Sequence, residues 1–534
     1  MEVRKQSFIK GAAILAVAGL ITKALGAVYK LPLNYIIGSE AMGYYQASYD
    51  WYVWALTMST YAIPIAISKL VSEKIELGRR ADAHKTFKVA FGLSALMGLL
   101  VTLFLFFGSG SLVGIFKNPG SRYAVTAIAP AIFLVSISAA LRGYFQGMQN
   151  MIPSAVSQVI EQSGRVLFGY IFAIMLLPKG PQLSAGGAAF GTTVGGLLSA
   201  SVLLYMYRRY RPAIQNSIQQ VPARKTESAA SIVKKILVFA VPITIGGSIM
   251  PVMGLIDSLI VFDRLQAAGY GYTTAVEMYG QLKALALSFI NLPQIITISL
   301  SASLVPAIAE SMTRRDLDSA IKKSELGIRL SLLIGLPAAM GLFVLSNPIM
   351  VMVSPKENIV AGIALRYLAP AAIFLTLVQT LTGILQGMGK ERIPVVNLLI
   401  GAMVKLIVSY TLTSIPTLNI RGAALGTVFG YAVPCLLNFR AIIKLQKKPM
   451  NFSKTILKPA IATAMMTVVA YYGYRTIFAA AGSNTIATIL SILISILVYA
   501  VILILIKGVT IEELQMAPGG GRLSKVLKKK GLLR

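Results

Sequence analysis

The sequence is poor in the residues that build metal and nucleophile sites. Its 534 residues include one cysteine, Cys435, and one histidine, His84. A single cysteine cannot form an internal disulfide, and one residue of each type excludes the usual zinc ligand sets. His84 falls in the charged run EKIELGRRADAHK, so we expect a solvated loop residue. The pattern GxxxxGK[ST] is missing, so the chain is not expected to be a P-loop ATPase. We expect no enzyme activity and no cofactor.

Charged residues are also scarce. They make up 13% of the chain, hydrophobic residues make up 56%, and the mean hydropathy is +0.73. This composition predicts an all-α polytopic membrane protein rather than a water-soluble one. Basic residues outnumber acidic ones by 50 to 19, for a formal charge of +31. They lie in short clusters between long apolar runs, as the positive-inside rule describes, so we expect no nucleic-acid partner.

Long apolar runs predict about fourteen transmembrane helices, since roughly 20 mainly apolar residues cross a bilayer. The predicted spans are 7–29, 50–71, 86–108, 122–147, 153–177, 185–207, 232–262, 274–305, 325–346, 358–387, 393–414, 421–443, 455–477 and 485–507. The strong basic clusters follow even-numbered spans, which predicts a multi-pass protein of the cell membrane with both termini in the cytoplasm.

An internal repeat divides the chain. The phrase LRGYFQGMQNMIP (141–153) returns as LTGILQGMGKERIP (381–394), and GGAAFGTTVG (186–195) returns as RGAALGTVFG (421–430). Six spans separate the copies, which predicts two parallel six-helix lobes. The predicted parts are an N-lobe at 1–220, a C-lobe at 221–448, a C-terminal helix pair at 449–510 and a basic cytoplasmic tail at 511–534.

Glycines recur within the repeated phrase at a fixed spacing. Gly143 and Gly147 are four residues apart, as are Gly383 and Gly387 in the second copy. Each pair therefore lies on one helix face, where a neighbouring backbone can approach closely.

Ionisable residues inside predicted spans are the candidate functional residues. Each costs about 2.5–3.5 kcal/mol at mid-bilayer on insertion scales, so such residues usually face a wet cavity or a partner. We expect these side chains to line a substrate cavity: Lys23, Lys30, Arg142, Glu161, Arg165, Asp257, Arg264, Lys283 and Lys405. Basic members predominate, and a cationic cavity suits a phosphate or pyrophosphate group. Their spacing lets Glu161 and Arg165 pair, either functionally or as a purely structural pair. Snorkelling to the membrane surface is the alternative for the basic residues.

Two further features bear on this cavity. Lys405 sits close in register to Arg165 of the first lobe. The aromatic run YYQASYDWYVW (44–54) fits an interfacial aromatic belt, and a surface that stacks on sugars is the alternative.

Several segments resemble a known family. They are TKALGAVYKLPLNYIIGSEAMGYYQASYDWY, AIPIAISKLVSE, LRGYFQGMQNMIP, DRLQAAGYGYTTAVEMYGQL and INLPQIITISLSASLVPAIAE. They resemble the polysaccharide-export flippases of the stage V sporulation protein B branch, relatives of the MurJ-type lipid II flippases. The resemblance implies fourteen helices, a lipid-tail groove at the last two, and a cationic central cavity for an undecaprenyl-linked peptidoglycan precursor. It places Lys23, and less directly Lys30, among the cavity's basic residues, with lysine where the family pattern has arginine.

The expected function is alternating-access transport of a lipid-linked saccharide, with lipid II as the first candidate substrate. Without an ATP site, a coupling ion such as Na⁺ or H⁺, the membrane potential or product removal must supply direction. Expected partners are the lipid-linked oligosaccharide, membrane lipids and cell-wall synthesis proteins. The alternatives are a flippase for a teichoic-acid, capsule or exopolysaccharide unit, a multidrug/cation antiporter, and a scaffold for a sporulation or division complex.

Overall fold

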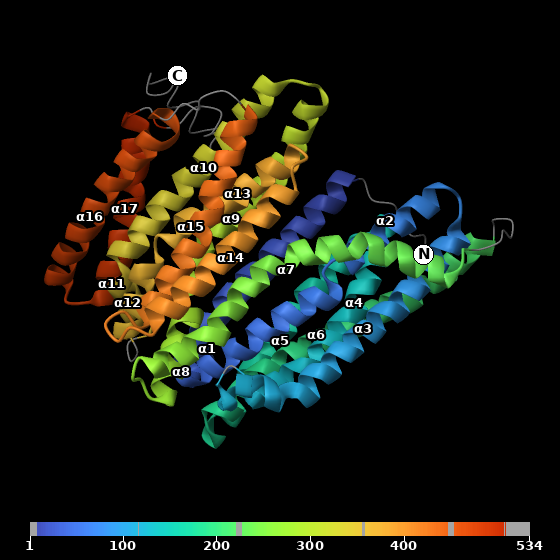
Figure 1. Ribbon diagram of the computed structural model, residues 1–534, viewed down its shortest axis with the longest axis horizontal. Coiled ribbons are helices and arrows are strands. Elements are labelled where there is room, and N and C mark those ends of the chain that lie inside the picture. The colour runs from blue at the N-terminus through green and yellow to red at the C-terminus, as the bar shows by residue number, and fades with distance from the viewer. Residues whose placement is uncertain are drawn as a thin grey trace. The chain divides into compact units, whose positions relative to one another are not determined.

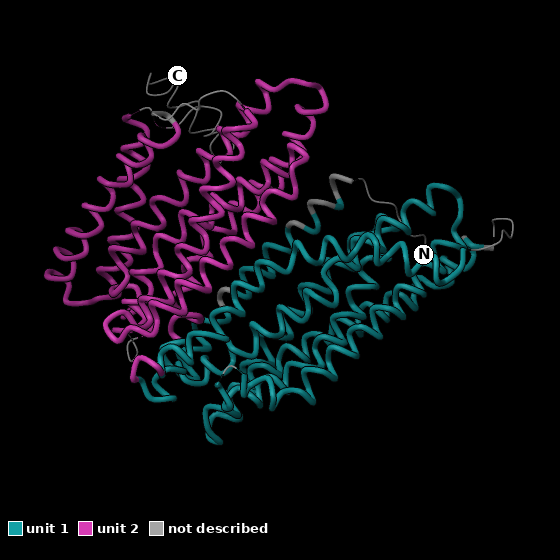
Figure 2. Tube along the Cα trace, in the orientation of Figure 1, with its two compact units in different colours: residues 1–266, 270–280 teal, residues 267–269, 281–534 magenta. Residues whose placement is uncertain are grey.

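The computed structural model describes residues 8–115, 117–219, 227–354, 358–446, 453–506 and 508. Within these residues every regular element is a helix. The chain divides into two compact units (Figure 2). Unit 1 comprises residues 1–266 and 270–280, and unit 2 comprises residues 267–269 and 281–534. The predicted basic tail at 511–534 lies outside the described residues.

Unit 1 is built from eight labelled α-helices in its described part (Figure 1). They are α1 (Phe8–Thr60), α2 (Ile63–Glu76), α3 (Arg80–Ile115), α4 (Arg122–Gly147), α5 (Ile152–Leu176), α6 (Pro181–Gln219), α7 (Ala229–Ala267) and α8 (Tyr272–Gly280). Short 3-10 turns at Pro119–Ser121 (η1) and Leu177–Lys179 (η2) precede α4 and α6.

Unit 2 begins with a π-helical segment, η3 (Gln281–Ala286), that leads into α9. Its helices are α9 (Leu287–Thr313), α10 (Leu317–Val344), α11 (Ser346–Val353), α12 (Asn358–Leu368), α13 (Ala371–Gly387), α14 (Arg392–Thr413), α15 (Ile420–Gln446), α16 (Lys458–Ala481) and α17 (Asn484–Leu505). A second π-helical segment, η4 (Ser453–Leu457), precedes α16.

Twelve described helices are long and apolar enough to cross a membrane, or thirteen with the bent pair α12–α13. One of the twelve, Val17–Glu76, has 60 residues. At 1.5 Å per residue it would extend about 90 Å, roughly three bilayer cores. The helix breaks at Gly38, whose φ of 80° and ψ of 165° are not helical. Figure 1 shows the ribbon of α1 changing direction along its length. The segment thus holds two of the predicted spans, and the count agrees with about fourteen.

The bent pair corresponds to the single span predicted at 358–387. Its two parts, Ile359–Leu368 and Ala371–Gly387, meet at 43°. Pro370 stands at the junction, as the N-cap of α13. Proline has no N–H to donate and clashes with a preceding helical turn, which explains why the span is broken here.

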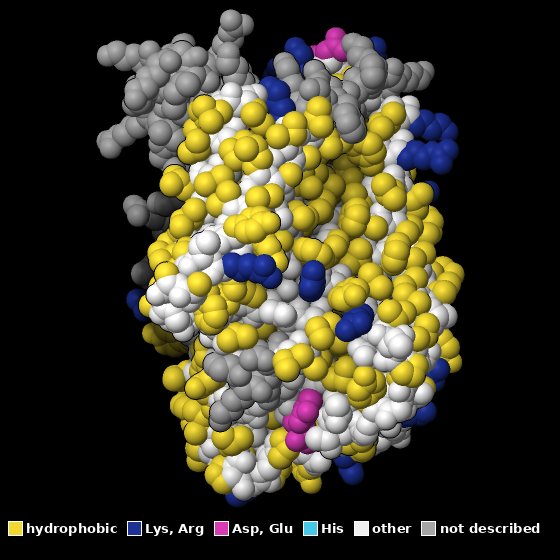
Figure 3. All heavy atoms as spheres, turned by 90° about the vertical axis from the view of Figure 1, so that its left-hand side faces the viewer, with side chains coloured by type: hydrophobic (Ala, Val, Ile, Leu, Met, Phe, Trp, Pro, Cys, Tyr) yellow, Lys and Arg dark blue, Asp and Glu magenta, His cyan; other side chains and the backbone are white. Residues whose placement is uncertain are grey.

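The surface of unit 2 suits a hydrocarbon environment. Figure 3 shows the face that carries α16 and α17, and hydrophobic side chains cover most of it. The exposed side chains include Met465, Val468, Leu493, Ile496 and Leu497. An apolar surface of this extent on helices of membrane-spanning length faces lipid.

The glycines of the repeated phrase make the same kind of packing contact twice. A Cβ at Gly143 of α4 would lie 2.8 Å from the Cα of Pro64, at the start of α2. In unit 2, a Cβ at Gly387 of α13 would lie 2.9 Å from the carbonyl oxygen of Val305 in α9. Both glycines therefore allow close backbone approach, which confirms the predicted glycine faces.

Helices α7 and α8 group with α1–α6 in unit 1. The contacts that hold them there include three polar ones: the Tyr279 hydroxyl donates to Asp50 Oδ2 (2.8 Å), the Tyr272 hydroxyl donates to Asn118 Oδ1 (2.7 Å), and Lys117 pairs with Asp263. The compact units are thus divided at a different place from the lobes, whose predicted boundary at residue 220 follows the repeat. That boundary stays a prediction.

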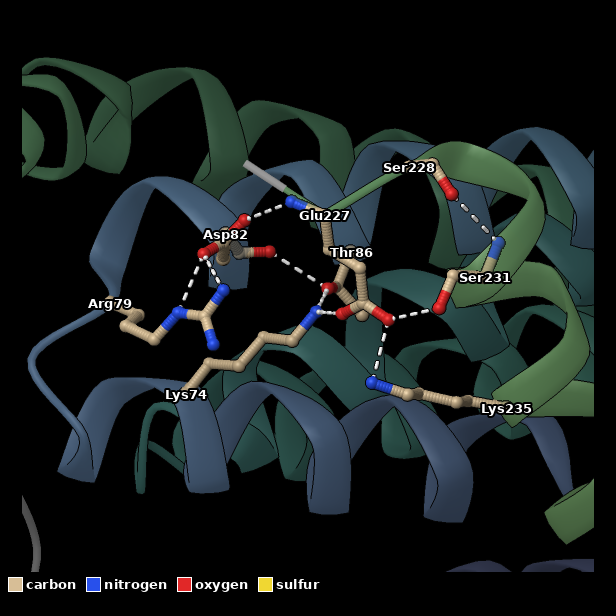
Figure 4. Close-up of polar contacts among 8 residues, drawn as sticks. All are labelled: Lys74, Arg79, Asp82, Thr86, Glu227, Ser228, Ser231 and Lys235. Atoms are coloured by element: carbon tan, nitrogen blue, oxygen red, sulfur yellow. Dashed lines mark hydrogen bonds and ion pairs between the residues drawn. The ribbon is translucent and has the colours of Figure 1, made fainter. Parts of the chain in front are cut away.

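A buried ion network fixes the start of α7 to α2 and α3 (Figure 4). Glu227 pairs with Lys74 at 2.9 Å and with Lys235 at 2.6 Å, and its backbone N–H donates to Asp82 Oδ1 at 2.9 Å. Lys74 also donates to the hydroxyl of Thr86 at 2.5 Å. The side chains of Lys74 and Glu227 are only 9% and 13% exposed, so these charges depend on each other rather than on water.

His84 departs from its prediction as a solvated loop residue. It lies in the first turns of α3, where its Nδ1 is 3.1 Å from the hydroxyl of Tyr144 and its ring stacks on Tyr207. Helix α3 begins earlier than hydropathy suggested, because the part of the polar run from Arg80 onward is helical, and His84 in it packs against α4 and α6.

Replacing Glu227 by Gln should destabilise unit 1 by about 2–3 kcal/mol, because it leaves Lys74 without its anion. Hydrogen bonds from Lys235, Lys74 and Ser231 lower the pKa of Glu227 from its usual value of 4.5 to about 2. The stabilisation is therefore complete above about pH 4.5 and is lost as pH falls toward 2. Apparent melting temperatures of both proteins in detergent should differ most near neutral pH and converge at low pH.

Glu73→Gln is the matched control. Glu73 pairs with Lys69 at 3.9 Å, and both side chains are more than half exposed. Its loss should leave the melting temperature nearly unchanged. Equal effects of the two substitutions would contradict a structural role for the buried network.

Candidate functional site

Arg165, on α5, has its positive charge held by neutral groups. Its guanidinium donates to the hydroxyls of Tyr45 (2.8 Å) and Tyr49 (3.1 Å) on α1. Its Cζ also lies 4.4 Å from the centre of the Tyr49 ring. No carboxylate among the described residues pairs with Arg165, and its Nε has no hydrogen-bond partner there. The two hydroxyls thus orient the guanidinium but do not neutralise its charge.

Lys30 approaches the same tyrosine from its own position on α1. Its Nζ lies 5.3 Å from the centre of the Tyr49 ring and 3.5 Å from Oε1 of Gln46. Two basic side chains therefore share one aromatic ring, and both remain partly accessible. We call Lys30, Arg165, Tyr45 and Tyr49 the basic–tyrosine cluster.

The tyrosines of this cluster were not predicted as site residues. Tyr45 is fully buried and stacks on Tyr49 at 5.9 Å, while Tyr29 packs edge-on against Tyr45 at 6.3 Å. An interfacial belt is therefore the wrong interpretation for Tyr45 and Tyr49, whose hydroxyls bind Arg165 inside the helix bundle. Residues 45, 49 and 52 recur at a spacing of four and three, and this helical face was the available signal.

Glu161 pairs with a different arginine from the one that its spacing suggested. Its Oε2 lies 2.7 Å from Nη2 of Arg142 on α4, whereas Arg165 turns toward α1. Arg142 also donates to the hydroxyls of Ser157 (2.8 Å) and Ser199 (2.9 Å). The predicted Glu161–Arg165 pair is wrong. Arg142 points into the bundle and joins α4, α5 and α6, rather than snorkelling.

Lys23 occupies the same face of α1 as Lys30, because residues seven apart nearly align on a helix. Its side chain is exposed and has no polar partner among the described residues. Lys23 is therefore an accessible cation about 10 Å along the helix from Lys30.

Asp257 and Arg264 both lie on α7 and have different surroundings. Asp257 is 1% exposed and interacts electrostatically with Tyr279, the residue that donates to Asp50. Arg264 pairs with Asp263, which also binds Lys117. Arg264 is therefore a member of a surface ion cluster, whereas Asp257 is a buried acidic group.

Lys283 and Lys405 belong to unit 2 and are 8% and 2% exposed. Lys405 packs as Arg165 does in unit 1. A Cβ at Gly430 of α15 would lie 2.9 Å from the Cβ of Lys405, and a Cβ at Gly195 of α6 would lie 3.3 Å from that of Arg165. Since the two glycines are equivalent in the repeat, Lys405 and Arg165 occupy equivalent places.

The arrangement in unit 1 is suited to an anion. Arg165 and Lys30 present positive charge without a carboxylate at Arg165, and guanidinium groups bind phosphate through paired N–H donors. Tyrosine hydroxyls hold the guanidinium in place and can release it to a stronger, charged acceptor. Within the described residues no group of three or more metal-ligating side chains is present.

Comparison with known proteins agrees with a membrane transporter fold. A lipid II flippase MurJ in an inward closed conformation is similar with a TM-score of 0.66 and 16% identity, covering 92% of this chain and 98% of that one. An inward-facing MATE multidrug transporter is similar with a TM-score of 0.66 and 14% identity, covering 81% of this chain and 99% of that one. These likenesses confirm the all-α polytopic fold.

The sequence relatives define the family. The family described as "Polysaccharide biosynthesis protein" matches residues 8–312, more than half of the chain, and the MatE family matches residues 283–411. The chain therefore belongs to the polysaccharide biosynthesis protein family of multi-pass membrane proteins.

Two relatives from Bacillus subtilis (strain 168) are similar over most of the chain. Stage V sporulation protein B is 29% identical over 527 residues, covering 97% of this chain and 99% of that protein. The lipid II flippase MurJ is 27% identical over 467 residues, covering 84% of each. The predicted resemblance is thereby confirmed.

Double-mutant cycles should separate the two possible partners of Glu161. We expect Glu161→Gln and Arg142→Gln to show a coupling energy of about 1–3 kcal/mol, because their side chains are hydrogen-bonded and only 25% and 13% exposed. Glu161→Gln and Arg165→Gln should be nearly additive. Unfolding of the single and double variants in detergent measures both values, and a larger coupling with Arg165 would contradict the observed pairing.

Proposed function

We propose that this protein is a flippase that moves a polyprenyl-pyrophosphate-linked saccharide, first of all lipid II, across the cytoplasmic membrane. The observation that carries the proposal is Arg165, a part-buried guanidinium that has no anionic partner among the described residues and is held by two tyrosine hydroxyls. A pyrophosphate is the kind of acceptor that such a group lacks. Relatives named as lipid II flippases support the choice of substrate.

In the proposed cycle the pyrophosphate binds the basic side chains while the prenyl chain stays in lipid. Lys23 and Lys30 extend the positive charge along one face of α1, and Lys405 supplies the equivalent charge in unit 2. Alternating access then exposes the head group on the other side of the membrane. Arg142 and Glu161 act as positioning residues, because their bonds fix α4, α5 and α6 around the arginine.

We further propose that a Na⁺ or H⁺ gradient, or the membrane potential, gives the transport its direction. Asp257 is the candidate carrier of the coupling ion, since it is a buried carboxyl beside Tyr279. The proposed orientation has both termini in the cytoplasm, and membrane lipids and cell-wall synthesis proteins are the proposed partners. Comparing transport rates under a sodium gradient, a proton gradient and neither would identify the driving ion.

Two other functions remain as alternatives. Another lipid-linked polysaccharide unit would present the same pyrophosphate, and only its sugars would differ. A multidrug/cation antiporter is the second alternative, and the MatE match at residues 283–411 supports it. The uncompensated positive charge at Arg165 weighs against a cationic substrate, since like charges repel in a low-dielectric site.

Transport of labelled lipid II into the protected leaflet of liposomes tests the proposal. Arg165→Gln should lower the rate about tenfold or more, because it removes charge-assisted bonds to the pyrophosphate. The transport rate of Arg165→Lys should lie between those of the unsubstituted protein and Arg165→Gln, since lysine keeps the charge but loses the paired donors. The triple variant Lys23→Gln, Arg165→Gln, Lys405→Gln should fall to the rate of empty liposomes.

Lys69→Gln is the control, because Lys69 is a half-exposed cation away from the cluster. A folded triple variant with an unchanged rate would exclude the cationic site. Faster transport of another polyprenyl-linked saccharide would change the substrate but keep the mechanism. Restored growth of cells depleted of their own lipid II flippase would support lipid II as a cellular substrate.

A further inference from the structure

A groove of about 610 Å³ lies among α3, α4 and α6 of unit 1, away from the basic–tyrosine cluster. Its walls include Phe106 of α3, Arg122, Tyr123 and Pro130 of α4, and Phe190 of α6. The side chains of Phe106, Tyr123 and Phe190 are 41%, 54% and 41% exposed, so the groove is open on one side. On a helix bundle of membrane-spanning length, such an opening faces lipid.

The groove is polar at one end and apolar along its length. Arg122 is the first residue of α4, and Pro130 stands eight residues further along, about 12 Å down the helix. The neighbouring helix α3 likewise has a residue close to Arg122 and an aromatic residue further along the groove. Gly110 lies beneath Arg122, where a Cβ would be 3.9 Å from the guanidinium carbon, and Phe106 is one turn beyond it. The cation thus lies at the start of α4 beside Tyr123, and Phe106 and Pro130 lie further along their helices.

The charge at the polar end has no counterion in the described part of the chain. Arg122 has no carboxylate partner there, whereas Lys117 and Arg264 share Asp263. Helix α4 also has no acidic residue in its first turn. The N-terminal end of a helix carries partial positive charge, so an arginine placed there adds to the positive potential rather than offsetting it.

We propose that this groove binds one anionic phospholipid of the bilayer. Its phosphate lies at the Arg122 guanidinium, and an acyl chain follows Tyr123, Pro130, Phe106 and Phe190 into the membrane. Arginine binds phosphate through paired N–H donors, and the aromatic walls supply the apolar contact that an acyl chain needs. The volume lies within the range of ordinary small-molecule sites.

One cation distinguishes this groove from a site for the transported head group. A pyrophosphate bears more charge than one arginine can match, and the groove walls have no second basic side chain in the described residues. A single phosphate with a diester linkage fits that charge. The lipid would therefore be a bound component of the protein and not its cargo.

The purified full-length chain tests the proposal by lipid retention in native mass spectrometry. We expect one phosphatidylglycerol to remain bound in preference to phosphatidylcholine. Arg122→Gln should lower that retention about tenfold, because the charge-assisted contact is lost. Ala127→Leu should lower it too by filling the groove while keeping the arginine, since Ala127 lines the same walls.

Lys179→Gln is the matched control, because Lys179 is an exposed cation beside the start of α6 and does not line the groove. It should retain phosphatidylglycerol as the unsubstituted protein does. Equal retention of the two lipids, or no effect of Arg122→Gln, would overturn the proposal. Displacement of phosphatidylglycerol by a polyprenyl phosphate at equal concentration would also overturn it, by assigning the groove to the transport substrate.

Discussion

A positive charge that hydroxyl groups hold without neutralising it is the interaction on which the candidate site depends. Arg165 is bonded by Tyr45 and Tyr49, and Glu161, which could have neutralised it, is bound by Arg142 instead. Leaving the Arg165 guanidinium without a carboxylate lowers the stability of the fold, because a charge in a medium of low dielectric is favourable only with a counterion or water. The arrangement keeps the guanidinium oriented and leaves its charge available to a ligand.

The internal repeat determines the surroundings of individual charged side chains as well as the overall fold. Gly195 and Gly430 each leave room for the Cβ of a basic residue on the neighbouring helix, so the duplicated sequence places Arg165 and Lys405 in matching environments. Gly143 and Gly387 likewise bring corresponding helices together in the two units. Small residues set how closely helices pack in a membrane, and the spacing of glycines therefore positions the charged side chains next to them.

Hydropathy and repetition predicted the helices, the glycine faces and the register of Lys405 with Arg165, because these depend only on spacing along the chain. They did not predict which side chains meet across helices. Glu161 stands four residues before Arg165, a spacing that favours pairing on one helix face, yet its partner comes from α4. That choice depends on the rotation of each helix about its axis, which a weak hydrophobic periodicity does not specify. For the same reason the sequence did not predict the role of Tyr45, the contacts of His84 or the ion pair between Lys74 and Glu227.

The two ends of α7 are each fixed by one carboxylate that serves two cations. Glu227 binds Lys74 and Lys235 at one end, and Asp263 binds Lys117 and Arg264 at the other. With 19 acidic residues against 50 basic ones, sharing of this kind makes substitution unequal in effect. Losing one of these four cations leaves the acid with a second partner, whereas losing the acid removes an ion-pair partner from two cations at once. Variation in related chains should therefore be tolerated more readily at the bases than at these two acids.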